Sequence, residues 1–421
     1  MTTQNTQGAT QTGRKPWLTV IGIGDDGLPG ISGAARALID AAELLVGGER
    51  HLSMVPPSSA ERLTWAGGVH TAVKEIQAWR GRRVVVLATG DPMWFGGGAN
   101  LSRHFGADEM TVITHPGAFS LAAAAMLWSM ADVVTLNAHS RPLAGLNLHI
   151  HPGARLLVLS RDGALPGEAA ALLTERGFGP SLITVLEHLG GPRERRFTAV
   201  AEAWSQRRAA DLNVLAIECR PGPKPRLIPP VPGLPDALYS HDGQLTKREV
   251  RALTVSALAP LPGQVLWDIG AGAGSVAIEW LRAAPAQRLA VGEARAIAVE
   301  RDAARVAMIA QNALALGVPK LNVVHGQAPA VLADLERPDT IFLGGGLTDS
   351  GLIEACWQAL PAGGRMVANA VSLEGQARLI ALKGTVGGEL MRLGVARAEP
   401  VGSLSAFRPL LDVTQFVGIK A

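Results

Sequence analysis

Short apolar runs alternate with longer amphipathic stretches along most of this 421-residue chain. A run of about four to eight apolar residues bounded by turn residues is typical of a buried strand, and apolar residues at every third or fourth position are typical of a helix. The pattern predicts strands over residues 17–22, 44–46, 83–88, 111–114, 133–136, 155–159, 182–186, 214–218, 265–267, 296–299, 322–325, 340–343 and 365–369. It predicts helices over residues 33–43, 69–79 and 303–316, with others starting at Ser275 and within 242–251. This alternation indicates an α/β fold.

The stretch 264–301 carries the clearest ligand-binding pattern. An apolar run ends in Asp268, a glycine-dense turn follows (Gly270-Ala271-Gly272-Ala273-Gly274-Ser275), and after a helical pattern a second apolar run ends in Glu300. Strand, glycine turn, helix, strand and acid in this order form the first half of a nucleotide-binding α/β sheet. The glycines let a ligand approach the backbone, and a strand-end carboxylate such as Glu300 can accept both hydroxyls of a ribose.

The spacing of the glycines distinguishes two kinds of ligand. A pyrophosphate-binding turn has the pattern G-x-G-x-x-G ahead of a helix N-terminus. Here the pattern is G-x-G-x-G, and an acid precedes it by two residues. It resembles the first motif of the Rossmann-like class I S-adenosylmethionine (SAM) methyltransferases, whose ligand has no phosphate. A second glycine turn at 361–365 strengthens the resemblance, with a dinucleotide site and a purely structural turn as the alternatives.

Composition limits the class of protein. The length allows two domains with separate cores, and no apolar run reaches the roughly 18 residues of a membrane span. The first fifteen residues are polar, rich in glutamine and threonine, and lack an apolar core, so no signal peptide is expected and residues 1–16 are expected to be a disordered tail. Cys219 and Cys356 lie far apart in apolar segments and are expected to be buried reduced thiols. These features predict a cytoplasmic protein without a membrane partner.

The charge is mild, at +3, and aromatic residues make up 4% of the chain. Nucleic-acid binders usually concentrate basic side chains on one face together with stacking aromatics. Scattered arginines suit a small acidic substrate better, so no nucleic-acid partner is expected. His149 and His151 form a His-x-His pair, but two ligands without a neighbouring cysteine or acid cluster make a poor metal site, so no metal is predicted.

A third glycine-rich turn, at residues 22–27, has the letter pattern G-x-G-x-x-G. Leu28-Pro29-Gly30 interrupts it, and the helix is expected to begin only at Ser32, a good N-cap. We therefore interpret this match as coincidental and do not expect a phosphate-binding site there.

The motifs that follow this turn carry a family resemblance. Together with the Gly22/Gly24 turn itself, they are Gly90-Asp91-Pro92, Pro116-Gly117 before a small-residue helix, and Glu187-His188-Leu189-Gly190. In this order they resemble the tetrapyrrole methylases (class III methyltransferases), SAM enzymes of corrin and sirohaem biosynthesis with a two-lobed fold that holds SAM in a cleft. The resemblance covers residues 17–219 and implies the SAM-binding residues Gly90, Asp91, Pro116, Gly117 and Ser120. The chain departs from many relatives by having Asp25-Asp26 where they have Pro-Gly.

Residues 220–236 are rich in proline and are expected to form a semi-rigid linker to a second domain, 237–421. That domain resembles the decarboxylating precorrin methyltransferases of cobalamin biosynthesis, through the motifs at 246–251, 268–274, 300–302, 326–329 and 364–370. The fused order resembles the bifunctional precorrin methyltransferases. The resemblance implies methylation of precorrin-6B at carbon 5 by the first domain, and methylation at carbon 15 with loss of an acetate carboxyl group in the second.

The resemblance also implies roles for individual residues. One SAM site is expected in each domain, the second lined by Thr246, Asp268, Gly270, Gly272, Gly274, Glu300 and Ala328. Candidate substrate contacts are Lys247, Arg248, Arg251, Arg193, Arg195 and Arg196, for which a solvated surface is the alternative. Asn369 and Glu374 follow a strand on the binding rim and are candidates for handling the proton that decarboxylation requires. Because relatives of both halves associate, a homo-oligomer is expected.

Other functions fit parts of the pattern. An NAD-dependent two-domain dehydrogenase would use the same sheet, and a nucleic-acid or protein methyltransferase would use the same cofactor. The second would be expected to carry a motif such as Asn-Pro-Pro-Tyr where this chain has Leu343-Gly344-Gly345-Gly346. A SAM-sensing regulator is a third, non-enzymatic reading. The metal content of the macrocycle, the order of the two methylations and channelling between sites are left open.

Overall fold

The computed structural model describes residues 16–65, 69–205, 208–284 and 292–421. The chain divides into two compact units, which are described separately. Unit 1 comprises Met1–Arg141 and His151–Pro225, and unit 2 comprises Pro142–Ile150 and Arg226–Ala421. Most of the tail predicted at 1–16 lies outside the described residues. No helix among the described residues is long and apolar enough to span a membrane.

Unit 1 begins with a five-stranded, all-parallel sheet in the order β3-β2-β4-β1-β5. Its strands are β1 (Leu18–Ile23), β2 (Leu44–Gly47), β3 (Glu61–Thr64), β4 (Val84–Thr89) and β5 (Met110–Ile113). Its helices are α1 (Gly33–Asp40), α2 (Glu49–Ser53), α3 (Val73–Ala78) and α4 (Gly97–Leu101). Alternate strand residues pack against α3 and α4 on one face and against α1 and α2 on the other. Both faces are covered, which explains the continuous apolar strands.

The second lobe of unit 1 is a mixed sheet in the order β6-β7-β10-β8-β9, in which only β6 and β7 are parallel. Its strands are β6 (Val134–Asn137), β7 (Arg155–Leu159), β8 (Leu182–Glu187), β9 (Arg195–Val200) and β10 (Asn213–Glu218). Helix α5 (Ala118–Met126) packs Phe119 and Ala122 onto this sheet, and α6 (Leu165–Glu175) contacts β8.

The glycine motif at 22–27 does not open a helix, as predicted. It leads into a 3-10 turn, η1 (Leu28–Gly30), and α1 begins only after Ser32, whose hydroxyl accepts a hydrogen bond from the Ala35 N–H. The other 3-10 segments are η2 (Val69–Ala72), η3 (Met130–Asp132), η4 (Leu143–Leu148), η5 (Ala201–Ala203), η6 (Asp236–Leu238) and η7 (Leu332–Asp334). The single helix predicted at 69–79 is therefore η2 followed by α3.

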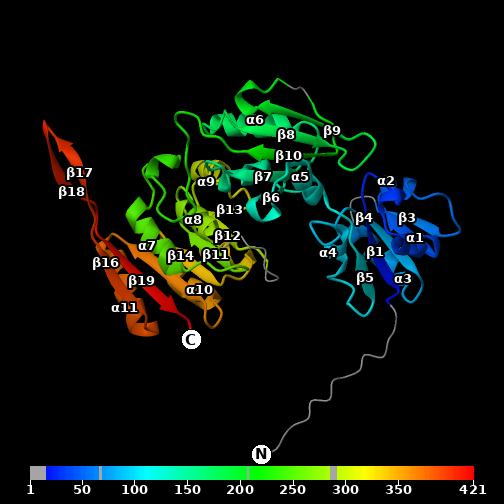
Figure 1. Ribbon diagram of the computed structural model, residues 1–421. Helices are drawn as coiled ribbons and strands as arrows, with labels where there is room; N and C mark the ends of the chain where they lie inside the picture. Colours follow the sequence, from blue (N-terminus) through cyan, green and yellow to red (C-terminus); the bar gives the residue numbers. More distant parts are fainter. Residues whose placement is uncertain (1–15, 66–68, 206–207, 285–291) are drawn as a thin grey trace, which may run out of the picture. The chain divides into compact units, whose positions relative to one another are not determined.

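Unit 2 is built on a seven-stranded sheet in the order β13-β12-β11-β14-β15-β19-β16 (Figure 1). Its strands are β11 (Val265–Ile269), β12 (Arg295–Glu300), β13 (Asn322–His325), β14 (Thr340–Leu343), β15 (Arg365–Ala370), β16 (Glu389–Leu393) and β19 (Val413–Ile419). The first five are parallel, and β19 is antiparallel to both its neighbours. From β11 the chain adds β12 and β13 on one side, then crosses to β14 on the other. Ligands bind at such a switch point in open α/β sheets.

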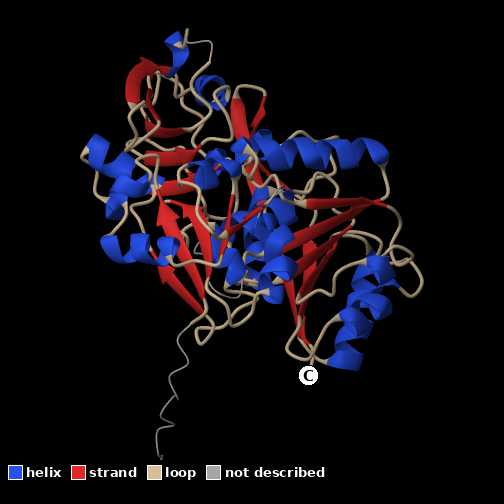
Figure 2. Ribbon diagram, turned by 90° about the vertical axis from the view of Figure 1, so that its right-hand side faces the viewer, coloured by secondary structure: helices blue, strands red, loops and turns tan. Residues whose placement is uncertain are grey.

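Helices cover both faces of this sheet (Figure 2). Side chains of α7 (Arg248–Leu258), α8 (Ser275–Ala283) and α9 (Ala303–Ala315) pack with alternate strand residues such as Leu266 and Phe342 on one face. Side chains of α10 (Leu352–Ala359) and α11 (Leu373–Val386) pack with the intervening residues, such as Trp267 and Ile341, on the other. Cys219 and Cys356 are buried free thiols, as predicted, and burial raises the pKa of each to about 12.

The second half of the proline-rich stretch packs on unit 2 through a buried ion pair. The Glu279 carboxylate accepts hydrogen bonds from the Leu234 N–H (3.0 Å), the Tyr239 hydroxyl (2.9 Å) and Arg251 Nε (2.6 Å). Glu279 and Arg251 are 1% and 0% exposed. The Arg282 guanidinium donates to the Pro229 carbonyl at 2.9 Å. These contacts fix the segment from about Pro229 onward against α7 and α8.

Candidate functional site

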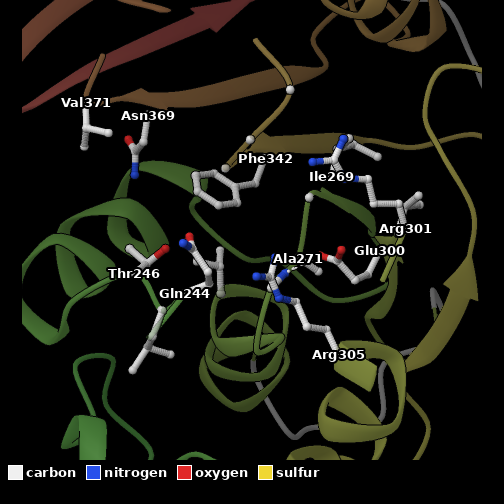
Figure 3. Close-up of a pocket in the computed structure, with 18 of the residues that line it drawn as sticks. Gln244, Thr246, Ile269, Ala271, Glu300, Arg301, Arg305, Phe342, Asn369 and Val371 are labelled. Atoms are coloured by element: carbon white, nitrogen blue, oxygen red, sulfur yellow. Dashed lines mark hydrogen bonds between the residues drawn. The ribbon is translucent and has the colours of Figure 1, made fainter. Parts of the chain in front are cut away.

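A cavity of about 680 Å³ opens at the carboxyl ends of the parallel strands of unit 2. This volume lies in the roughly 300–1,000 Å³ range of small-molecule sites. Glu300 and Arg301 lie on one side of it and Asn369 and Val371 on the other, with Phe342 between them (Figure 3). The predicted site residues that line it are Thr246, Lys247, Gly270, Gly272, Glu300, Ala328 and Asn369.

The glycines of the turn serve two different purposes. Gly270, Gly272 and Gly274 all have positive φ, at 69°, 58° and 74°, which disfavours any residue with a Cβ. Gly270 and Gly272 face the cavity, whereas a Cβ at Gly274 would lie 2.7 Å from the Ile309 side chain. Gly274 therefore lets α9 approach the turn and lies outside the cavity lining.

Glu300 closes the cavity beside this turn. It is 4% exposed, and its two carboxylate oxygens accept hydrogen bonds from the Gly272 N–H (2.8 Å) and the Asp302 N–H (3.0 Å). A carboxylate oxygen can accept a second hydrogen bond. Glu300 therefore fixes the shape of the glycine turn and still has acceptor capacity for a ligand.

Asp268 lies beneath the turn and does not line the cavity. Its carboxyl is 1% exposed, and Oδ2 accepts a hydrogen bond from the Ala277 N–H (3.0 Å) in the first turn of α8, while Oδ1 has no partner. Burial, opposed by that hydrogen bond and assisted by the charge of Glu300, raises the pKa of Asp268 to about 7. A pyrophosphate would need the N–H groups at this helix start. The carboxyl group that occupies one of them favours a ligand without phosphate.

The predicted substrate contacts fall in different places. Lys247 lines the cavity, and Arg248 is exposed on the first turn of α7 outside it. The interpretation of Arg251 as a substrate contact is wrong, because its side chain is fully buried and bonded to Glu279. Glu374 lies away from the cavity in a second hollow of about 540 Å³ that Glu354 and Arg378 also line.

Several lining residues were not predicted from sequence. Arg301 and Arg305 extend from the end of β12 and the start of α9, and Arg305 forms an ion pair with Asp242 (2.8 Å). Two basic side chains beside Glu300 give the cavity mouth a mixed charge that suits an acidic molecule. Apolar residues from the last part of the chain complete the lining: Val371, Val395, Leu410, Leu411 and Val413. The charge run 300–305 was a usable sequence signal, whereas the apolar residues depend on the pairing of β19 with β15.

In unit 1 the structure brings the predicted motifs together at the end of β4. Gly90 has a φ of 56°, and a Cβ there would lie 2.9 Å from the Gly117 Cα. Asp91 Oδ1 accepts a hydrogen bond from the Met93 N–H (2.9 Å), and Pro116 adjoins Gly117 at the start of α5. Ser120 is exposed on the first turn of that helix.

Asp25 and Asp26, the departure from the family pattern, contact basic or imidazole side chains. Asp25 bonds Arg50 (2.9 Å) and His188 Nδ1 (3.2 Å), which joins the glycine turn to the end of β8 in the second lobe. Asp26 lies 3.3 Å from His115 Nε2. Next to Arg50, burial and the charge of the guanidinium lower the pKa of His51 to about 4. Arg195 forms an ion pair with Glu187 on the neighbouring strand (2.6 Å).

The fold and the site of unit 2 define a class. The Rossmann-like sheet has a glycine turn with an acid at the end of the next strand, and one N–H group at the helix start is bonded to Asp268. This combination is that of a class I SAM methyltransferase. Residues 237–420 match the family model of the precorrin methyltransferase domain, and residues 17–203 match that of the tetrapyrrole (corrin/porphyrin) methylases. Precorrin methyltransferases are SAM-dependent enzymes. Glu300, Gly270 and Gly272 all line the cavity in unit 2.

Relatives identify the family more narrowly. The chain is 46% identical over 406 residues to the precorrin-6Y C(5,15)-methyltransferase (decarboxylating) of a Sinorhizobium species, covering 96% of this chain and 97% of the relative. It belongs to that family. A cobalt-precorrin-7 C(5)-methyltransferase of Salmonella typhimurium is 34% identical over 178 residues, 42% of this chain and 88% of the relative. A Saccharolobus solfataricus protein described as a cobalt-precorrin-6B C(15)-methyltransferase (decarboxylating) is 34% identical over 149 residues, 34% of this chain and 72% of the relative.

Proposed function

We propose that this chain transfers methyl groups from SAM to carbons 5 and 15 of a precorrin-6 macrocycle and removes a carboxyl group from its ring C acetate side chain. The sequence predicts the substrate as precorrin-6B, and the full-length relative is named for precorrin-6Y. The observation that carries the proposal is the unit 2 cavity, with Glu300 and the glycine turn on one side and Asn369 on the other.

One activity is assigned to each domain, with one SAM site in each. The C(5) and the C(15) decarboxylating relatives are separate proteins, and each matches less than half of this chain. This division supports one methylation in each domain. As the family resemblance implies, we assign carbon 5 to the tetrapyrrole methylase domain, and carbon 15 with decarboxylation to the precorrin methyltransferase domain. In unit 1, Gly90, Asp91, Pro116, Gly117 and Ser120 remain the proposed SAM-binding residues.

The cavity in unit 2 offers the groups that this chemistry needs. SAM, when bound, supplies a methyl group to an electron-rich ring carbon, and positioning contributes most of the acceleration of such a displacement. In the decarboxylation the bond to the carboxyl carbon breaks, its electron pair passes into the ring, carbon dioxide leaves and a proton is taken up. Lys247, Arg301 and Arg305 are basic side chains at the cavity that can hold the other carboxylates of the macrocycle.

The direct test uses the full chain, labelled SAM and the precorrin substrate, with products analysed by mass for methyl groups gained and carbon dioxide lost. Wild type is expected to add two methyl groups and release one carbon dioxide. Glu300→Gln keeps the side-chain shape but weakens charge-assisted hydrogen bonds worth about 1.5–3 kcal/mol. Carbon 15 methylation should fall by roughly 10- to 100-fold at limiting SAM, and carbon 5 methylation should persist.

Glu354→Gln, at an exposed acid that lies outside the main cavity, serves as the matched control. It is expected to leave both methylations unchanged. Absence of SAM binding by wild-type enzyme in calorimetry would refute the proposal, and binding of SAM without turnover would favour a SAM-sensing regulator.

The hairpin of β17 (Ala396–Val401) and β18 (Leu404–Pro409) supports the proposal of a homo-oligomer. It forms a separate two-stranded sheet that extends from the end of unit 2 (Figure 1). Leu404 and Phe407 are 76% and 78% exposed, which is unusual for large apolar side chains on a paired strand. Sedimentation should show wild type larger than one chain, and Phe407→Asp should shift it toward the monomer. A monomeric wild type would contradict this part of the proposal.

A further inference from the structure

A buried polar group in unit 2 has no explanation in the packing of the sheet. Gln415 lies on β19 directly opposite Asn369 on β15, and its side chain is 1% exposed. Successive side chains on β19 point to opposite faces of the sheet. Phe416 therefore packs on the face covered by α10 and α11, while Gln415 faces α7. A buried amide costs about 1–3 kcal/mol for each unpaired group, and Gln415 Oε1 has no partner. An apolar residue would fill this position at lower cost.

The hydrogen bonds of Gln415 reach the cavity through one residue. Gln415 Nε2 donates to Asn369 Oδ1 at 3.0 Å and to Thr254 Oγ1 at 3.1 Å. Asn369 Nδ2 donates to the same Thr254 oxygen at 2.9 Å. Asn369 lines the cavity, but Gln415 and Thr254 are outside its lining.

The direction of these bonds follows from Thr254. This residue is fully buried in the middle of α7, and its hydroxyl donates to the Val250 carbonyl at 2.8 Å. Since a hydroxyl has one proton, Thr254 Oγ1 can only accept from the two amides. The Asn369 NH₂ group must therefore point to Thr254, and its oxygen must point to the Gln415 NH₂ group. Reversal of the Asn369 amide would place two donors against each other and lose both bonds.

We infer that Gln415 and Thr254 are positioning residues that fix the orientation of the Asn369 amide, so that Asn369 presents one N–H donor and one carbonyl lone pair to the reacting macrocycle. This inference rests on the proposed function of unit 2. The donor and the acceptor suit a tetrapyrrole edge, which carries carboxylates that accept and pyrrole-type N–H groups that donate. Asn369 has no proton to exchange near neutral pH, so it holds the substrate and does not act as the acid or base.

The test measures both methylations and carbon dioxide release by the full-length enzyme. Gln415→Met keeps the length of the side chain and removes the donor. It should lower kcat for carbon 15 methylation and carbon dioxide release by roughly 10- to 100-fold, since small misplacements have effects of that size. The KM for SAM and the rate of carbon 5 methylation should stay close to wild type. Thr414→Val is the matched control, on the same strand but with an unpartnered hydroxyl outside the cavity lining.

Two further variants separate positioning from stability. In an Asn369→Ala background, Gln415→Met should have no additional effect, because Gln415 acts only through Asn369. Gln415→Glu replaces the donor by an acceptor when ionised and restores one donor when protonated, so its activity should rise as pH falls, relative to wild type. Equal losses with and without Asn369, a flat pH profile relative to wild type, or equal losses at carbons 5 and 15 would each overturn the inference. A wild-type enzyme that releases no carbon dioxide would overturn the proposed function and this inference with it.

Discussion

The two units both place a glycine turn at the end of a central parallel strand, but the turns do different things. In unit 2, Gly270 and Gly272 line a cavity, although a Cβ at these positions would also lie 3.2 Å from the Gly345 backbone and 3.0 Å from the Gln244 carbonyl oxygen. In unit 1, a Cβ at Gly22 would lie 2.0 Å from the Gly90 carbonyl oxygen, so this glycine is needed for contact between backbone segments. A glycine pattern therefore indicates close approach of backbone segments, and only the surrounding elements show whether a cavity also opens beside the turn.

The ion pairs of the two units differ in how deeply they are buried. In unit 2 the Arg251–Glu279 pair is fully buried and holds the linker segment. In unit 1, Asp25 pairs with Arg50, whose side chain is 36% exposed. A buried pair that loses one partner leaves an uncompensated charge, whereas a pair near water is weakly coupled. Removal of one partner should therefore lower the free energy of unfolding by amounts that differ by several kcal/mol between the two networks.

Removal of the buried guanidinium should have the largest effect on stability. Arg251→Met leaves Glu279 without its cation and is expected to destabilise unit 2 by about 3–5 kcal/mol. Arg378→Met, at an exposed ion pair with Glu354, should cost less than about 1 kcal/mol. Denaturant unfolding of both variants measures the difference. Similar losses in the two variants would contradict the contrast between buried and exposed pairs.

A fall in pH should change the stability of the two units in opposite directions. His51 in unit 1 has its pKa lowered from 6.5 to about 4, so its contribution to stability is present above pH 6.5 and is lost as pH falls toward 4. Asp268 in unit 2 has its pKa raised from 3.8 to about 7, so its contribution is present below pH 4 and is lost as pH rises through 7. Each shift corresponds to a change on the order of 3–4 kcal/mol.

Calorimetry of the full chain between pH 4 and 8 measures this opposition. His51→Gln should flatten the loss of stability of unit 1 on acidification, and Asp268→Asn should flatten the loss in unit 2 as pH rises. If both unfolding transitions keep their wild-type pH dependence in these variants, other groups dominate the dependence of stability on pH.

The close approach of backbone segments in unit 1 is tested by adding one methyl group. Gly90→Ala places a Cβ against Gly117 at a φ of 56° and should cost about 1–3 kcal/mol, with loss of carbon 5 methylation. Gly153→Ala is the matched control, because Gly153 also has a positive φ, 79°, but has open space around it. A comparable loss of carbon 5 methylation in both variants would mean that backbone strain alone is responsible.

Features that depend on local pattern were predicted well from the sequence. The apolar runs 265–267 and 296–299 became β11 and β12, and the glycine turn lies at the switch point beside the cavity. Ser32 caps α1 as its position suggested. Each of these features is set by residues close together in the chain, where period, turn chemistry and capping act directly.

Features that depend on distant pairing were missed. Arg251 has the spacing of a solvated helix residue, but its partners Glu279 and Leu234 come from other segments. Gln415 reaches Asn369 only because β19 inserts antiparallel beside β15. Glu374 follows the same strand rim as Asn369, yet α11 carries it into a separate hollow. Sequence spacing does not fix such contacts, because they follow from strand order and helix placement.

The smallest expected effect concerns Asp25, which pairs with Arg50 and contacts His188 of the second lobe of unit 1. Asp25→Asn keeps the side-chain volume and one hydrogen bond but removes the charge that faces Arg50 and His188, and it should cost about 1 kcal/mol. SAM binding by unit 1 should be unchanged if Asp25 only joins the lobes. Glu218→Gln, at an exposed pair with Arg220 in the same unit, provides the comparison and should cost less. Measured by thermal unfolding and SAM calorimetry, a loss of SAM affinity at unchanged stability would instead make Asp25 a ligand residue, and the two glycine turns would then be alike in function.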